Sequence, residues 1–182
     1  QKMEIKELPF AGLFLINSFF ANDERGSFVK NFHKDKFNSH GIDFELRELF
    51  YSESKKDVIR GMHFQTPPHE HSKIIFPMKG SILDVVVDLR KDSDSFGKYH
   101  VEEISYKDNK ALYIPEGFAH GFLSLENDTR MVYLVNKEHS PNNDSGIRWD
   151  SFGFKWPCIK PLISNRDMSF NALDQIMPLN LF

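Results

Sequence analysis

Histidines gather in one part of the chain, where they could bind a metal ion or move a proton. The sequence has eight histidines. Three of them, His63, His69 and His71, lie close together, and His120 follows later in the chain. Alternate residues of a β-strand face the same side, so the imidazoles of His69 and His71 could converge on one ion. The pattern therefore permits two kinds of chemistry, metal binding and proton transfer.

The residues around this cluster favour proton transfer. The segment His69–His71 resembles the metal-binding strand of cupin barrels, in which a Glu ligand follows the histidine pair at a fixed distance ahead of a Gly. In this chain Lys73 occupies that position ahead of Gly80. A second cupin element, Pro-x-Gly-x-x-His, is intact in Pro115–His120. Because an ammonium group beside a divalent ion is electrostatically unfavourable, we expect a cupin-like barrel without a bound metal.

Lys73, a histidine and a tyrosine together suit the removal of a proton from a carbon next to a ketone. The ammonium of Lys73 can stabilise an oxyanion that develops on a carbonyl. A neutral imidazole titrates near working pH and can take the proton of the adjacent carbon. Tyr133 could return a proton from the opposite face, although a buried Tyr more often only packs. Asp84 and Asp88 could also be catalytic, but such carboxylates are more often solvated or paired with a nearby Arg.

Short apolar runs separated by turn residues predict an all-β fold. Phe accounts for 18 of the 182 residues, and aromatic side chains favour sheets. Helical periodicity is present only near residues 35–40 and after residue 167. The run 81–89 does not alternate strictly, which predicts a strand covered on both faces, as in a closed barrel. The predicted strands are 13–17, 28–32, 44–52, 58–64, 73–79, 81–89, 98–105, 111–114, 121–125 and 131–137.

Length and composition exclude several classes of protein. A chain of 182 residues with 40% hydrophobic and 27% charged residues is expected to form one domain, residues 1–182. A formal net charge of -3 offers no basic surface for nucleic acid. The apolar runs are too short to cross a bilayer, and no segment has the order of a signal peptide. The single cysteine, Cys158, cannot form an internal disulfide, so we expect a cytoplasmic protein with no membrane or nucleic-acid partner.

Further motifs are spread along the chain. They are Asp23–Gly26, Ile59–Gln65, Asp84–Arg90, Ser95–Gly97, Ile114–Phe122, Gly146–Asp150 and Leu162–Asp167. Their sequences and spacing resemble those of the dTDP-4-dehydrorhamnose 3,5-epimerase family, from about residue 5 to about residue 168. The resemblance implies a cupin-like double-stranded β-helix, or jelly-roll, barrel with small helical segments at the C-terminus.

The same resemblance implies a role for each member of a catalytic set. His63 matches the family's catalytic base, and Asp167 matches the carboxylate paired with it. Lys73 matches the lysine that stabilises the enolate, and Tyr133 matches the proton donor. Neither a metal nor another cofactor is implied. The positions expected to hold the diphosphate and the sugar are Arg25, Arg60 and His120.

Several positions of the expected nucleotide pocket depart from the family's pattern. His139 stands where the family has a Tyr that stacks on thymine, and Lys30 stands where it has a Glu. Glu48, with the two residues after it, replaces a Gln-Asp-Asn run. Asp144 replaces a Glu, and Arg166 replaces a Lys. We therefore expect the chemistry to be retained, while the identity of the nucleotide stays open.

The predicted function is the epimerisation of a nucleotide-linked 4-keto-6-deoxyhexose at C3, C5 or both. The resemblance places this reaction in rhamnose-type deoxysugar biosynthesis for cell-surface polysaccharide. It also implies a homodimer with an exchanged N-terminal strand, which suits the apolar stretch 13–20.

Three other functions stay open at this point. A cupin 3,4-ketoisomerase would use similar groups on the same class of substrate, but the intact segment Arg60–Gln65 and Tyr133 favour epimerisation. A silent sugar-binding cupin is disfavoured because every catalytic position is filled. A metal-dependent cupin dioxygenase is disfavoured by Lys73, and its ligands would be His63, His69, His71 and His120.

Overall fold

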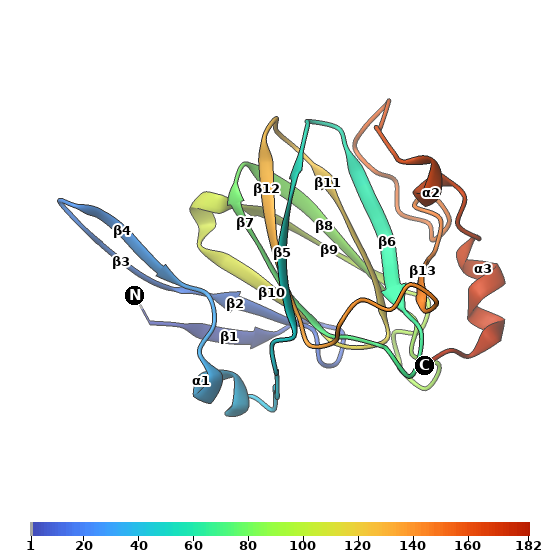
Figure 1. Cartoon of the computed structure of the whole chain (residues 1–182), viewed down its shortest axis with the longest axis horizontal. Coiled ribbons are helices and arrows are strands. Elements are labelled where there is room, and N and C mark those ends of the chain that lie inside the picture. Colours follow the sequence, from blue (N-terminus) through green and yellow to red (C-terminus); the bar gives the residue numbers. More distant parts are fainter. Residues whose placement is uncertain (1) are drawn as a thin grey trace.

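Two antiparallel sheets face each other in the computed structural model of the chain, which describes residues 2–182 (Figure 1). In spatial order the six-stranded sheet consists of β1 (Glu4–Glu7), β2 (Phe14–Asn17), β10 (Lys110–Ile114), β7 (Lys73–Lys79), β12 (Thr129–Val135) and β5 (Glu48–Ser54). The five-stranded sheet consists of β13 (Asp144–Gly146), β6 (Ile59–Gln65), β11 (Phe118–Ser124), β8 (Ser81–Asp88) and β9 (Tyr99–Ser105). The strands β3 (Phe19–Asp23) and β4 (Gly26–Lys30) form a separate hairpin. The predicted all-β class is confirmed.

The helices are short: α1 and α3 lie where helical periodicity is predicted, α2 begins two residues before residue 167, and the turn η1 is not predicted. They are α1 (Lys34–Asn38), α2 (Asn165–Met168) and α3 (Leu173–Ile176), with single 3-10 turns η1 (Tyr106–Asp108) and η2 (Met177–Leu179). All ten predicted strands are present, although several begin or end a few residues away. The largest shift is in β5, which begins at Glu48 rather than at residue 44. The amine of Lys34 binds the carboxylates of Asp43 and Glu45 and the Phe44 carbonyl, so this segment stays beside α1.

Alternation along the strands sends one set of side chains into the space between the sheets. Ile75 of β7 and Met131 of β12 form one buried cluster with Val86 of β8 and Phe122 of β11. Burial of this apolar surface from both sheets holds them together. Two residues away along the same four strands, and therefore on the same inner faces, are Lys73, Tyr133, Asp84 and His120.

The outer face of each sheet is covered by other parts of the chain. Val85 and Val87 of β8 pack in a second cluster with Trp156, Leu173 and Ile176 of the C-terminal segment. The strand β8 is therefore largely buried on both faces, as predicted. This cover from the C-terminal segment supplies the second buried face. On the other sheet, Phe37 of α1 helps to cover the outer face in a third cluster.

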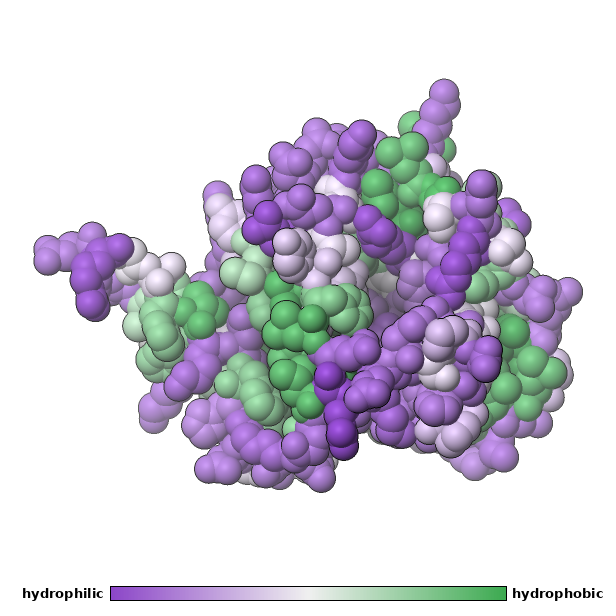
Figure 2. Space-filling model, in the orientation of Figure 1, coloured by the Kyte–Doolittle hydropathy of each residue, from purple (hydrophilic) through white to green (hydrophobic). Residues whose placement is uncertain are grey.

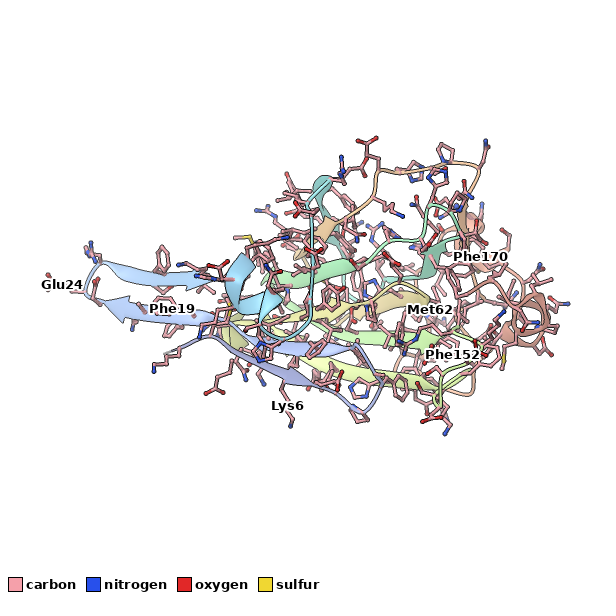
Figure 3. All side chains as sticks on the ribbon, turned by 90° about the horizontal axis from the view of Figure 1, so that it is seen from below. Lys6, Phe19, Glu24, Met62, Phe152 and Phe170 are labelled. Carbon is pink, nitrogen blue, oxygen red and sulfur yellow. The ribbon has the colours of Figure 1, made fainter. Side chains whose placement is uncertain are left out.

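The β3–β4 hairpin extends away from both sheets (Figures 1 and 3). Every residue of β4 is exposed, and 58% of the surface of Phe28 is accessible to solvent. In Figure 3 the hairpin tip at Glu24 lies at the opposite end of the molecule from Phe170. Within residues 2–182, no helix has both the length and the apolar character needed to span a membrane.

Candidate active site

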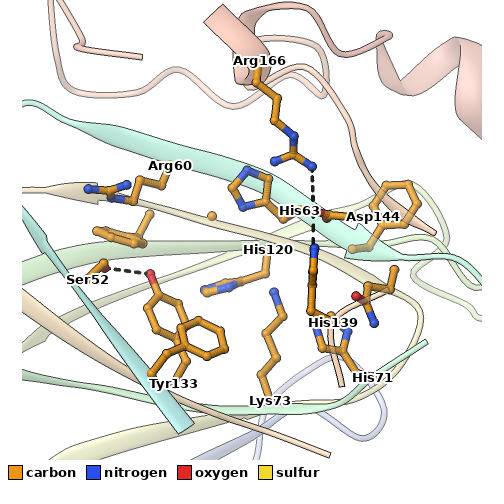
Figure 4. A pocket seen from close by; sticks show the side chains of 15 residues that line it. Ser52, Arg60, His63, His71, Lys73, His120, Tyr133, His139, Asp144 and Arg166 are labelled. Atoms are coloured by element: carbon orange, nitrogen blue, oxygen red, sulfur yellow. Dashed lines mark hydrogen bonds and ion pairs between the residues drawn. The ribbon is translucent and has the colours of Figure 1, made fainter. Parts of the chain in front are cut away.

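A cavity of about 280 Å³ opens between the two sheets, and polar side chains line it from both walls (Figure 4). The six-stranded sheet contributes Lys73 and Tyr133. The five-stranded sheet contributes Arg60, His63 and His120. Other polar residues around the cavity are Ser52, Gln65, His71, His139, Asp144 and Arg166.

His63 and Asp167 form a hydrogen-bonded pair on one wall. Nε2 of His63 lies 2.7 Å from Oδ1 of Asp167, and 32% of the His63 side chain is exposed. Burial acts to raise the pKa of Asp167, but hydrogen bonds from His63 and from the Gly61 amide outweigh it and lower that pKa below its usual value. The carboxylate is therefore ionised and accepts a hydrogen bond from Nε2, which leaves Nδ1 as the ring nitrogen with no partner within residues 2–182.

The backbone that positions this pair depends on a close contact between two glycines. A Cβ on Gly61 would lie 2.7 Å from Cα of Gly121 on the neighbouring strand β11. Gly61 also has φ of +151°, a conformation that favours glycine. The contact lets β6 approach β11 closely while the Gly61 amide donates to Oδ2 of Asp167 at 3.0 Å. Ser164 caps α2 and accepts the backbone N–H of Asp167, which fixes the backbone that carries the carboxylate.

Lys73 and Tyr133 face this pair from the opposite sheet. Lys73 is buried, and burial lowers the pKa of its amine to about 8, although the charges of Asp84 and Asp144 act in the opposite direction. Within residues 2–182 its amine has no hydrogen-bond or ion-pair partner, so it is available to a ligand in the cavity. The Tyr133 hydroxyl lies 3.2 Å from Oγ of Ser52, and its ring stacks on Phe50. Burial raises the pKa of Tyr133 to about 12, so the phenol stays protonated.

His120 is paired with Asp84, which was expected to be solvated, paired with an Arg or catalytic. Nε2 of His120 lies 2.7 Å from Oδ1 of Asp84, and both side chains are buried. Asp88 does pair with a nearby Arg: its carboxylate accepts a hydrogen bond from Nε of Arg90 at 3.0 Å. The interpretation of Asp88 is confirmed, and Asp84 has a histidine partner instead.

Cationic and acidic side chains surround the rest of the cavity. The Arg60 guanidinium is held by Oγ of Ser54 and the Glu53 carbonyl, each at 3.0 Å. Arg166 binds the Asp144 carboxylate at 3.0 Å, with His139 4.0 Å from the same oxygen (Figure 4).

Glu48 lies beside the main cavity. It accepts the backbone N–H of His139 at 3.2 Å and lines an adjoining cavity, shared with His71 and His139. The predicted binding residues Arg60, His120, His139, Asp144 and Arg166 therefore meet at one cavity, and Glu48 lies next to it.

Two predicted binding residues lie far from this cavity in the same chain. Arg25 is in the turn of the β3–β4 hairpin, where 86% of its side chain is exposed and it pairs with Asp23 at 2.6 Å. Lys30 ends β4 and lies over the Phe19 ring. The neighbouring hairpin tip at Glu24 is distant from Phe170, which contacts the His63 ring (Figure 3). Neither residue can reach the cavity of its own chain in this arrangement.

The prediction that His69–His71 forms a metal-binding strand is wrong. This segment is a loop, His69 is exposed, and the strand begins only at Lys73. His71 is the member that reaches the cavity. Burial, and then the charge of Lys73, lower the pKa of His71 to about 3, so it stays neutral. Across the part of the chain that the structure describes, no three His, Cys, Asp or Glu side chains are arranged to hold a metal ion.

Two of the cavity residues that sequence reasoning misses support Tyr133. Ser52 binds the Tyr133 hydroxyl, and Phe50 stacks on its ring. Both come from β5, which pairs with β12 so that Phe50 is opposite Tyr133. His71, predicted only as a possible metal ligand, also lines the cavity.

Comparisons with known proteins give one consistent result. Residues 7–175 match the family described as dTDP-4-dehydrorhamnose 3,5-epimerase. A relative of that name from Shigella flexneri is 37% identical over 150 residues, which cover 81% of this chain and 83% of the relative. These matches agree with the resemblance found in the sequence motifs.

Solved structures agree with the sequence comparisons. The dTDP-4-dehydrorhamnose 3,5-epimerase from Bacillus anthracis, with TDP and PPi bound, has a TM-score of 0.92 and 33% identity, and the match covers 94% of this chain and 100% of that chain. A 3′-monoepimerase from Streptomyces bikiniensis, in complex with dTDP-quinovose, has a TM-score of 0.90 and 29% identity, over 96% of this chain and 90% of that chain. The predicted cupin-like jelly-roll fold is confirmed.

Proposed function

Because the chain belongs to the dTDP-4-dehydrorhamnose 3,5-epimerase family, it is an isomerase of deoxysugar biosynthesis, and we propose that its cavity epimerises a nucleoside-diphosphate-linked 4-keto-6-deoxyhexose at C3, C5 or both. Residues 1–182 form the single catalytic domain in this proposal. It rests on one observation: the His63–Asp167 pair and the Lys73 and Tyr133 side chains enter one cavity from opposite sheets. A sugar ring between the two walls would meet a base on one face and an acid on the other.

His63 is the base in the proposed mechanism. Nε2 of His63 donates a hydrogen bond to Asp167, so the other ring nitrogen, Nδ1, is free to take the proton from the carbon next to the ketone. Asp167 stabilises the imidazolium that forms and holds the ring in place.

Lys73 and Tyr133 complete the reaction from the other wall. The carbon–hydrogen bond breaks towards the ketone, so the negative charge collects on the carbonyl oxygen, where the ammonium of Lys73 stabilises it. The Tyr133 phenol then gives its proton to the carbon from the face opposite His63, which inverts the centre. Its pKa of about 12 suits a donor that is protonated in the resting enzyme. Neither a metal nor a nicotinamide takes part in these steps.

Few cations of the cavity are free for the diphosphate, because Arg166 is paired with Asp144 and Lys73 serves the ketone in this mechanism. Arg60 is available there with its guanidinium held in place, whereas Arg25 and Lys30 are on the projecting hairpin. In our proposal the protein is a homodimer, and the hairpin of one copy carries Arg25 and Lys30 to the cavity of the other. Arginine suits this role because its planar fork pairs two phosphate oxygens at once.

The surface of the molecule supports such a dimer. Figure 2 shows hydrophobic side chains on the hairpin and near the centre of the same face, over the region where Figure 1 shows β5. Exposed apolar residues of these elements are Phe28 and Val29 of β4 and Leu49 and Phe50 of β5. Exposed apolar surface of this kind marks an interaction site. We also propose a cytoplasmic location, because the single Cys158 fits a reducing compartment.

The test of the activity is solvent-deuterium incorporation into a panel of nucleotide-linked 4-keto-6-deoxy sugars. We expect deuterium at C3, C5 or both, together with product inverted at the exchanged carbon. A product whose carbonyl has moved to C3 would instead identify a ketoisomerase. Retention of all carbon-bound protons in every sugar of the panel would refute the proposal.

A mixing experiment tests the shared site. Arg25→Ala and His63→Ala should each be nearly inactive alone. In a mixed dimer, the chain that retains His63 receives the hairpin of the chain that retains Arg25, so one of the two sites is intact. Random reassortment should therefore restore about a quarter of the wild-type activity. Failure to recover activity, when mixed dimers are shown to form, would contradict the exchange of hairpins.

A further inference from the structure

Asp84 and His120 form a second carboxylate–imidazole pair in the cavity, and the proposed reaction gives Asp84 no role. The two residues come from neighbouring strands, β8 and β11, and their side chains are 0% and 3% exposed. Oδ1 of Asp84 binds Nε2 of His120 at 2.7 Å. Its other oxygen, Oδ2, is buried and has no hydrogen-bond partner within residues 2–182. A buried carboxylate with only one partner is costly, so its charge must be compensated by the groups around it.

The charges around the pair compensate an ionised Asp84. On balance the pKa of Asp84 is raised by burial, to which Glu102 adds, while His120 and the ammonium of Lys73 act to lower it. Burial also lowers the pKa of His120, with Lys73 and His63 acting in the same direction and Asp84 against them. When Lys73 is protonated, a negative charge on Asp84 balances it, and the lowered pKa of His120 keeps the imidazole neutral.

This charge distribution selects one tautomer of His120. An ionised carboxylate can only accept hydrogen bonds, so Nε2 must carry the proton that it shares with Asp84. Nδ1 of the neutral ring then carries a lone pair. No side chain or backbone group of residues 2–182 donates a hydrogen bond to it. The ring lines the cavity, and in Figure 4 it lies between Tyr133 and Lys73.

Several acceptors of the cavity are already engaged: the Asp144 carboxylate is paired with Arg166, and Oε1 of Gln65 accepts the Ser140 N–H. Arg60, Lys73 and Arg166 can only donate hydrogen bonds, which suits ketone and phosphate oxygens. Nδ1 of His63 is occupied by the carbon proton during the reaction. A ring hydroxyl of the sugar must donate its own proton to an acceptor, or it is left unpaired when it enters the cavity.

We propose that Asp84 is a positioning residue that holds His120 in the tautomer with a free Nδ1, so that His120 accepts a hydrogen bond from the C2 or C3 hydroxyl of the sugar ring. The inference rests on the proposed function for its substrate. In this proposal the Asp84–His120 pair binds and orients the sugar ring, while the His63–Asp167 pair moves the proton.

The tautomer can be measured on the wild-type protein without any substrate. Nitrogen-15 NMR of the histidine side chains separates a protonated from an unprotonated ring nitrogen, and the His120 signals are those missing from His120→Asn. We expect a neutral ring with its proton on Nε2 between about pH 6 and pH 8. A proton on Nδ1, or a charged ring in this range, would overturn the proposal. This result does not depend on activity, so it stands apart from a failure of the proposed function.

Substrate analogues identify the hydroxyl. Deuterium exchange is measured on the parent sugar nucleotide and on its 2-deoxy and 3-deoxy analogues. His120→Phe should lower kcat/KM about tenfold on the parent sugar, the effect of one hydrogen bond. It should cause no further loss on the analogue that lacks the bound hydroxyl. His120→Asn should recover part of the loss, because its amide oxygen can take the place of Nδ1. Equal losses on all three sugars would refute the assignment.

Asp84→Asn tests the positioning role itself. An amide can either accept from Nε2 or donate to it, so both tautomers of His120 become available. We expect the NMR signals to show a mixture and KM for the parent sugar to rise, with less change in kcat. A fall in kcat alone, with the tautomer unchanged, would contradict the role. If this variant does not fold, the wild-type spectrum and the His120 variants still decide the question.

Discussion

Replacement of Tyr133 by Phe separates the two proton transfers of the proposed reaction. The substitution removes only the hydroxyl, which lies 3.2 Å from Ser52, and keeps the ring that stacks on Phe50 with centroids 4.8 Å apart. The loss of this hydrogen bond should cost about 1 kcal/mol of folding free energy, so the variant should fold. His63, Asp167 and Lys73 are unchanged, and the enolate should still form.

The expected effect is a split between exchange and inversion. Return of a proton from the Tyr133 face loses a donor worth about 10²–10⁴ in rate, which corresponds to about 3–5 kcal/mol of barrier. Return of a proton from the His63 face stays possible. The variant should therefore exchange the substrate's protons with deuterated water while it gives little inverted product. Lys73 lies on the same wall and could supply a proton more slowly, so the loss of inverted product could be as small as about 10² in rate.

Proton NMR of one reaction in deuterated water follows both quantities, because loss of the carbon-bound signal reports exchange and the coupling constants report configuration. Tyr113→Phe is the matched control, since Tyr113 is packed in the cluster that covers the outer face of the sheet. It should leave both rates unchanged. Inverted product at the wild-type rate would show that another group is the acid. Loss of exchange as well as inversion would tie Tyr133 to binding or to the enolate.

Three further outcomes follow from the same site. His63→Ala should lower proton exchange by about 10²–10⁴, while Asp167→Asn should lower it less, because Asp167 only holds and tunes the base; rapid exchange by His63→Ala would refute the assignment. The protonated form of Lys73 is the active one, so kcat/KM should be retained below its pKa of about 8 and should fall as the pH rises through it, whereas Lys73→Met should be slow at every pH and lack this decline. Activity should survive prolonged chelation, and a loss that one added metal restores would favour a metal-dependent cupin.

A stability prediction tests the contact between β6 and β11. Gly121→Ala would place a Cβ 2.6 Å from the Arg60 carbonyl oxygen, which is backbone and cannot move aside freely. We expect a loss of about 1–3 kcal/mol in urea unfolding, together with slower exchange because the Gly61 amide supports Asp167. Wild-type stability would show that the two strands can separate locally.

Local pattern was enough to predict most of the strands. The strand β7 occupies the predicted residues, Lys73–Lys79, and the alternation of β12 correctly places Tyr133 on a sheet face. Such patterns are properties of neighbouring residues, so they can be read along the chain. The same is true of the motifs around His63, His120 and Asp167, whose spacing carries the resemblance to the family. The loop at His69 could also have been anticipated, because Pro67 and Pro68 disfavour a continuing strand.

The partners of these side chains were decided by the tertiary structure. Asp167 meets His63 across 104 residues of sequence, and Asp84 meets His120 across 36. Asp88 has a local partner in Arg90, two residues further on, whereas nothing near Asp84 in the sequence identifies His120 as its partner. The difference arises because β8 lies next to β11, with Asp84 opposite Phe122 and close to His120.

The sequence likewise could not predict where Arg25 and Lys30 lie relative to the cavity. A motif can identify a residue as part of a site, but it contains no information on the direction in which its hairpin leaves the sheets. Here the hairpin projects from the body, so both residues lie away from the cavity that their own chain builds. The sequence by itself determined which residue types the chemistry has available. The packing of two sheets determined which of them face one another, because that depends on strand order and register between segments that are distant in the chain.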